Sequence, residues 1–221
     1  MLTRFAFSAL LCLAALPSFA ENWSIGGAIG PFVFGRFAER TVVINTETGT
    51  GKTTSRLSAA TRPGAAADIE RDFNDWLAVR LEAAWTQSKL RLKSSGGGTG
   101  VTIDSGRVNV TTFVVPFVVR LNRGSIRFHL MGGPAYALYN MHRRTGEGSV
   151  PLFEGTRGRW GGAGGAGVGW RWSERFGIEG QITDIVTGSP FRREDIAATN
   201  IGVHIPKPQN VHTTLGIRYR F

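Results

Sequence analysis

Cysteine is almost missing from this sequence. The one cysteine, Cys12, lies near the start of the 221-residue chain, inside an apolar run that follows Arg4 and ends in Ser18-Phe19-Ala20. A basic residue, a short apolar run and a small-x-small ending are typical of a secretory signal peptide. We predict that residues 1–20 are this peptide and that cleavage follows Ala20. The exported chain would then have no disulfide to stabilise it.

Long hydrophobic runs are also missing from the rest of the chain. No segment of residues 21–221 approaches the roughly 18 to 20 consecutive apolar residues of a membrane helix, and helical periodicity is weak. The length fits one domain. The formal net charge is +10, which in an exported protein favours anionic lipid headgroups, lipopolysaccharide phosphates or acidic polysaccharides as partners. We expect no nucleic acid partner.

A complete nucleotide-binding motif is absent too. The sequence TETGTGKTTS (46–55) contains Gly-Lys-Thr, the end of a phosphate-binding loop, but Thr46 stands where the first glycine of that loop is required. Pro63 and Gly64 follow where a helix should begin. We therefore expect no nucleotide.

What the sequence does contain is a regular alternation of apolar and polar residues. In the C-terminal NVHTTLGIRYRF, the residues from Val211 to Phe221 alternate between an apolar and a polar face, which is typical of a strand with two different environments. The same period of two recurs seven more times. The predicted strands cover residues 22–36, 64–73, 76–90, 107–121, 125–141, 158–172, 176–188 and 208–221.

Short and long connections alternate strictly between these strands. The tight turns are 73–76, 122–125 and 173–176, and the long connections are 37–63, 91–106, 142–157 and 189–207. Outer-membrane barrels combine an even number of strands with short periplasmic turns and long extracellular loops. The polar faces carry charges, as the inside of such a barrel can. We therefore predict an all-β fold over residues 21–221, a transmembrane eight-stranded antiparallel up-and-down β-barrel with both termini in the periplasm.

The signal peptide, the eight segments and the ending LGIRYRF carry a family resemblance. The chain resembles the small outer-membrane barrels of Gram-negative bacteria, namely the OmpA transmembrane domain, OmpX/Ail and opacity-protein group; LMGGPAYALY is similar to their fifth-strand region. The resemblance implies that Gly216, Tyr219 and Phe221 form a signal read by the barrel-assembly machinery. It implies no single activity, because the group includes adhesins, surface anchors, serum-resistance factors and enzymes.

Charged residues on the predicted inner faces form the first candidate site. Opposite charges inside a narrow barrel should pair, because unpaired buried charge is very costly. We predict a plug of ion pairs, with a gated ion or proton path, a narrow low-conductance pore, as the alternative. The predicted interior residues are Glu70, Arg80, Glu82, Arg120, Arg127, His129, Arg171, Glu179 and Arg218.

A lipid A-modifying enzyme is the other alternative. Such an enzyme would need a histidine beside a serine near the lipid-facing rim. The histidines of the mature chain, His129, His142, His204 and His212, form no His-x-Ser pair, and they are too scattered to predict a metal site. We expect no catalytic residue, cofactor or metal.

Basic residues of the long connections form the last candidate site. Their clustering at the outer end would suit lipopolysaccharide phosphates, acidic surface polymers or host ligands. We therefore expect a structural, envelope-integrity or adhesive role. The predicted basic surface consists of Arg40, Lys52, Arg56, Arg62, Arg91, Lys93, Arg143, Arg144, Arg192 and Arg193.

Overall fold

The computed structural model describes residues 22–46, 49–96, 99–143, 154–192, 195 and 203–221. The predicted signal peptide lies outside these ranges, so it stays a prediction. None of the helices in the described part of the chain is long and apolar enough to cross a membrane.

The described chain consists almost entirely of antiparallel strands. They are β1 (Trp23–Phe34), β2 (Arg36–Thr46), β3 (Gly49–Ala59), β4 (Arg62–Asp72), β5 (Leu77–Gly96), β6 (Thr99–Val114), β7 (Phe117–Arg123), β8 (Ile126–Arg143), β9 (Gly155–Arg171), β10 (Phe176–Thr187), β11 (Val203–His204) and β12 (Gln209–Arg220).

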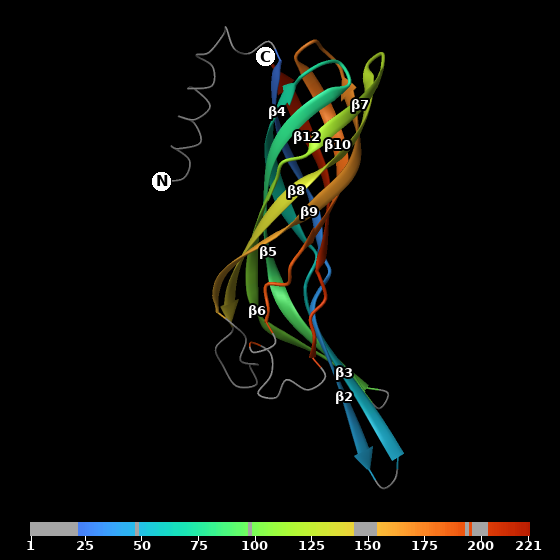
Figure 1. Cartoon of the computed structure of the whole chain (residues 1–221), viewed down its shortest axis with the longest axis vertical. Coiled ribbons are helices and arrows are strands. Elements are labelled where there is room, and N and C mark those ends of the chain that lie inside the picture. Colours follow the sequence, from blue (N-terminus) through green and yellow to red (C-terminus); the bar gives the residue numbers. More distant parts are fainter. Residues whose placement is uncertain (1–21, 47–48, 97–98, 144–153, 193–194, 196–202) are drawn as a thin grey trace.

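Backbone pairing closes the strands into a ring of eight walls, each wall being one strand or two consecutive strands. Figure 1 shows this barrel from the side. The order around the ring is β1, β4, β5, β6 with β7, β8, β9, β10 and β12, and β12 pairs again with β1. Two strands, β6 and β7, share one wall because Pro116, which has no N–H to donate, interrupts the ladder between them. The predicted eight-stranded antiparallel barrel is confirmed.

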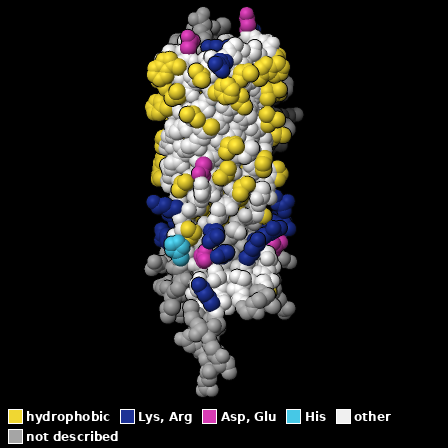
Figure 2. Space-filling view, turned by 90° about the vertical axis from the view of Figure 1, so that its right-hand side faces the viewer, with side chains coloured by type: hydrophobic (Ala, Val, Ile, Leu, Met, Phe, Trp, Pro, Cys, Tyr) yellow, Lys and Arg dark blue, Asp and Glu magenta, His cyan; other side chains and the backbone are white. Residues whose placement is uncertain are grey.

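Alternate side chains of each wall face opposite ways. On β5, the exposed fraction is 1% for Arg80 but 49% for Leu81. The outer surface carries a band of hydrophobic side chains, with Lys and Arg side chains gathered beyond one edge of it (Figure 2). A hydrophobic outer band of this kind is typical of a barrel that crosses a membrane.

The barrel interior has two layers. Toward the tight-turn end it holds charged side chains. Toward the other end it holds an apolar core, which the sequence analysis did not predict, built around Phe32, Phe37, Leu90, Tyr139 and Phe191. Eight strands enclose a space just wide enough for side chains to fill, so both layers act as packing.

For two of the four long connections, the prediction of a loop is wrong, because the structure has strands there. Most of the described residues of 37–63 belong to β2 and β3, and the described residues of 91–106 belong to the end of β5 and the start of β6. The reason is further pairing, because β3 pairs with the end of β5, from Thr53 opposite Gly96 to Ala59 opposite Leu90. These strands form a sheet that projects past the ring at the lower end of Figure 1.

Candidate functional site

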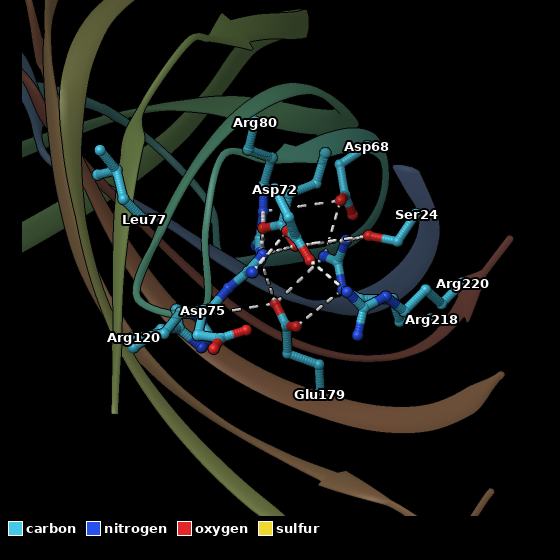
Figure 3. Close-up of polar contacts among 12 residues, drawn as sticks. Ser24, Asp68, Asp72, Asp75, Leu77, Arg80, Arg120, Glu179, Arg218 and Arg220 are labelled. Carbon is cyan, nitrogen blue, oxygen red and sulfur yellow. Dashed lines mark hydrogen bonds and ion pairs between the residues drawn. The ribbon is translucent and has the colours of Figure 1, made fainter. Parts of the chain in front are cut away.

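Arg80 lies at the centre of the charged layer (Figure 3). Its Nε donates to Oε2 of Glu70 at 2.9 Å, and its Nη2 lies 2.8 Å from Oε1 of Glu179. Its Nη1 donates to Oε1 of Gln181 at 2.6 Å, while Asp68 is 3.7 Å from Nε. One buried guanidinium therefore joins β5 to β4 and β10.

Two strands supply the other guanidiniums of the cluster. From β7, Arg120 donates to Glu70 and, at 2.5 Å, to Asp72. From β12, Arg218 donates to Glu179 at 2.9 Å and to the Ser24 hydroxyl of β1 at 3.1 Å. Two more ion pairs complete the cluster. Arg218 lies 2.7 Å from Asp68, and Arg220 lies 3.2 Å from Asp72.

The formal charges of this ion cluster balance. We define it as four arginines and four carboxylates, so that +4 and −4 sum to zero: Asp68, Glu70, Asp72, Arg80, Arg120, Glu179, Arg218 and Arg220. Each buried guanidinium meets more than one acceptor, which offsets the cost of removing it from water. The arrangement can tie walls together and fill the lumen at this level.

Four of the predicted interior residues lie at or beyond the edge of the cluster. Glu82 accepts a hydrogen bond from Gln181 at 2.7 Å, and His129 lies 3.6 Å from Glu179. Arg127 is half-buried, and its Nε has no hydrogen-bond partner in the described chain.

Arg171 was predicted to lie in the barrel interior, and the structure corrects this prediction. Its side chain is exposed and donates to the Gly124 carbonyl oxygen at 3.3 Å. The reason is its position, since Arg171 is the last residue of β9 and lies at the rim of the barrel, at the tight-turn end.

Sequence reasoning missed three of the eight cluster members, Asp68, Asp72 and Arg220, and the two uncharged partners Ser24 and Gln181. The signal for three of them was parity, because Asp68 faces the same way as Glu70 on β4 and Gln181 the same way as Glu179 on β10, while Ser24 lies on the inner face of β1. Asp72 and Arg220 were missed because they sit at strand ends, where the sequence does not show whether a side chain lies inside or in solvent.

A segment after β10 lies in the opposite mouth of the barrel. Ser189 donates to the Phe37 carbonyl oxygen at 2.7 Å, and Phe191 packs into the apolar core. Further along this segment, Asp195 accepts a hydrogen bond at 2.9 Å from Nη2 of Arg157, which lies on β9. Partial burial opposes ionisation of Asp195, but its hydrogen bonds from Arg157 and from the Arg192 N–H outweigh this and hold its pKa below the usual range.

The predicted basic residues lie mainly on strands. Lys52 and Arg56 are exposed on β3, Arg91 and Lys93 lie on β5, and Arg62 is exposed at the start of β4.

Some of the predicted basic residues form ion pairs, and others lie outside the residues that the structure describes. Arg56 lies 3.5 Å from Glu39, and Arg91 lies 3.6 Å from Asp104. Arg40 is half-buried on β2, and Arg192 is exposed. The side chain of Arg143 and all of Arg144 and Arg193 lie outside the described residues.

The three residues of the proposed assembly signal end the last wall. Gly216 faces Ala28 of β1, where an added Cβ would lie 2.3 Å from the Gly27 carbonyl oxygen, so this approach requires glycine. The Tyr219 and Phe221 rings meet at 5.2 Å, and the Phe221 N–H donates to the Trp23 carbonyl oxygen.

Comparison with known proteins decides the family. The family model described as "Outer membrane protein beta-barrel domain" matches residues 5–221. This chain belongs to that family. As an outer-membrane β-barrel protein, it is located in the outer membrane. No curated protein sequence matches it.

Solved outer-membrane barrels share the fold at low identity. OprG from Pseudomonas aeruginosa aligns with a TM-score of 0.62 and 11% identity, over 91% of this chain and 96% of OprG. Neisserial surface protein A aligns with a TM-score of 0.52 and 9% identity, over 90% and 97%. AlkL aligns with a TM-score of 0.52 and 10% identity, over 91% of each chain.

Within the described part of this outer-membrane barrel, the histidines do not combine with a serine and an acidic residue as a catalytic group would. His212 stacks on Phe32 with ring centroids 3.9 Å apart inside the lumen, while His142 and His204 are exposed. Ser189 already donates to backbone, and Ser149 lies outside the described ranges. Among the described residues, no group of His, Cys, Asp or Glu could hold a metal ion.

Deletion of Phe221 tests the assembly signal. We expect a lower yield of folded barrel in the outer membrane, because the deletion removes the terminal aromatic ring and the hydrogen bond to Trp23. The yield is measured as the heat-modifiable fraction on gels. Phe73→Ala is the matched control, since it removes an exposed aromatic side chain near the same end and leaves the C-terminus intact. Equal yields for the deletion and the wild type would contradict the assembly signal.

Proposed function

We propose that this outer-membrane barrel has a non-enzymatic role in the envelope surface, in which a basic collar binds phosphates of lipopolysaccharide and acidic surface polymers. In this proposal the tight turns and both ends of the mature chain face the periplasm, and the β2–β3 hairpin faces outward. The basic collar consists of Arg36, Arg56, Arg62, Lys89, Arg91, Lys93 and Arg107.

The observation that carries the proposal is the order of side chains on the outer face. Strand register aligns successive outward rows across β5, β6 and β8. Moving away from the tight-turn end, the rows are Trp85–Thr111–Leu138, Gln87–Asn109–Asn140 and Lys89–Arg107–His142. An apolar row is thus followed by a neutral hydrogen-bonding row and then by a basic row.

The basic row brings like charges together. Lys89 lies directly opposite Arg107, and this arrangement is unfavourable without an anion near both residues. Asp104 lies 3.6 Å from Lys89 and from Arg91, but no acidic side chain of the described residues pairs with Arg107. A phosphate or sulfate group at this row would complete the charge balance.

The filled interior supports a surface role over the pore. The neutral ion cluster lies toward the tight-turn end of the lumen and the apolar core toward the other end, so ions would meet side chains at both levels. The pairing of charges from different walls also favours the plug of ion pairs over the gated ion path.

Polyanion binding tests the proposal. The double variant Lys89→Gln/Arg107→Gln, held in lipid nanodiscs, should bind dextran sulfate about 30-fold more weakly, since each basic residue near a charged surface contributes about 1 kcal/mol. The matched control is Arg123→Gln/Arg175→Gln, which removes two exposed arginines at the tight-turn end. Equal loss in both double variants would show a general charge effect and would overturn the collar as the binding surface.

A further inference from the structure

One carboxylate lies on the outer, hydrophobic surface of the barrel. Asp184 belongs to the outward face of β10, between Ile182 and Val186, whose exposed fractions are 55% and 39%. Figure 2 shows acidic side-chain surface within the hydrophobic band. A charged group at such a position is costly in a membrane and therefore points to a site that uses it.

The carboxylate of Asp184 is only half satisfied. Its Oδ2 accepts a hydrogen bond from Gln209 Nε2 at 2.5 Å. Its Oδ1 is buried and has no hydrogen-bond partner among the described residues. Directly across the ladders lie Val211 on β12 and Gly164 on β9, neither of which offers a side-chain donor. A donor from outside the chain is therefore the missing partner.

An apolar groove begins next to this carboxylate. It has a volume of about 560 Å³ and runs across the outer face of β9, β10, β12 and β1. Its apolar side chains include Ile29, Ala166, Val168, Ile182 and Leu215.

The groove and the carboxylate follow one another along β10. Gly180 and Ile182 line the groove, and Asp184 is the next outward residue toward the mouth of the barrel. An occupant that suits both parts needs an apolar chain and, at one end of it, a hydrogen-bond donor.

We propose that this groove and Asp184 bind one lipid of the outer leaflet, with an acyl chain in the groove and an amide N–H or hydroxyl group donating to Asp184 Oδ1. Acyl chains joined to a sugar through amides, or carrying hydroxyl groups, offer this chemistry in lipopolysaccharide. The choice of leaflet rests on the orientation proposed above, in which the acyl chain runs from Asp184 toward the membrane centre.

The geometry favours a lipid over a second copy of the barrel. A single chain can enter a groove whose base contains glycine, whereas the convex wall of another barrel would leave such a groove unfilled. Lipid is also the solvent of this surface, so a lipid ligand is always present.

Native mass spectrometry of lipid retention tests the proposal. Wild-type protein released from nanodiscs that contain phospholipid and lipid A should retain one lipid A molecule. Asp184→Leu should reduce that retention about tenfold, because it removes a charged acceptor. Gly180→Leu should reduce it as well by filling the groove; an added Cβ there meets nothing closer than 3.8 Å, so the barrel can fold.

Gly132→Leu is the matched control, since Gly132 is exposed on β8 and an added Cβ there meets nothing closer than 3.7 Å. It should retain lipid A as the wild type does. Unchanged retention in both Asp184→Leu and Gly180→Leu would overturn the proposal. So would a lipid-free dimer that only Asp184→Leu converts to monomer, because the surface would then bind a second copy. Dextran sulfate binding by Gly180→Leu should stay at the wild-type level, which separates this site from the basic collar.

Discussion

Arg80→Met should lower the free energy of unfolding by about 3–5 kcal/mol, the usual cost of removing one partner from a buried ion pair. The methionine would fill much of the same space, so the loss comes from the charge. Glu70 would lose a hydrogen bond from Arg80 at 2.9 Å, and Glu179 would lose an ion pair with it at 2.8 Å. Arg120 and Arg218 would still pair with these carboxylates, but the buried cluster would hold four carboxylates and three arginines, a net charge of −1 that is costly away from water.

Urea unfolding in phospholipid vesicles, followed by tryptophan fluorescence, measures this loss. Arg127→Met is the matched control, because Arg127 lies in the lumen near the same end but outside the ion cluster. We expect a much smaller change for the control. Equal losses in the two variants would mean that Arg80 has no special role in holding the walls together.

The neighbouring substitution, Leu81→Arg, should destabilise the barrel by about 2–4 kcal/mol, as arginine does on the lipid face near the middle of the bilayer. Leu81 is half-exposed on the outer face and lies directly opposite Ile69 of β4. The new guanidinium would face hydrocarbon with no carboxylate beside it.

The same vesicle unfolding experiment measures this second loss. Leu81→Ala is its control, since it removes apolar contact with lipid without adding charge. A neutral effect of Leu81→Arg would mean that the two faces of β5 are assigned the wrong way round. Together the two experiments ask whether arginine is required at position 80 and excluded at position 81.

This contrast also shows what the sequence could predict. Alternation along β5 places Arg80 and Leu81 on opposite faces, and the alternating connection lengths distinguish a membrane barrel from a sandwich. Both signals are local, because the faces follow from the period of two and the turns from a few residues. The fold class was therefore predictable without the structure.

The partners within the site were not predictable in the same way. Which carboxylate meets Arg80 depends on the register between β4, β5 and β10, and Gln181 is 101 positions away from it. The ends of β5 and β6 were assigned to a loop because Gly and Ser are abundant there, yet pairing with β3 holds them in a sheet. Asp184 lies within the predicted strand 176–188, but it was overlooked because the sequence analysis considered charges on the polar faces only, and Asp184 falls on the face of Ile182 and Val186.

The ion cluster also bears on how the ring closes. Arg218 and Arg220, which supply +2 of its +4, both belong to β12, whereas three of its four carboxylates belong to β4. Without the last wall the remaining members would carry −4 and +2, a net charge of −2. The final strand therefore brings the neutralising charge, and the seam between β1 and β12 is sealed by electrostatics as well as by its backbone ladder.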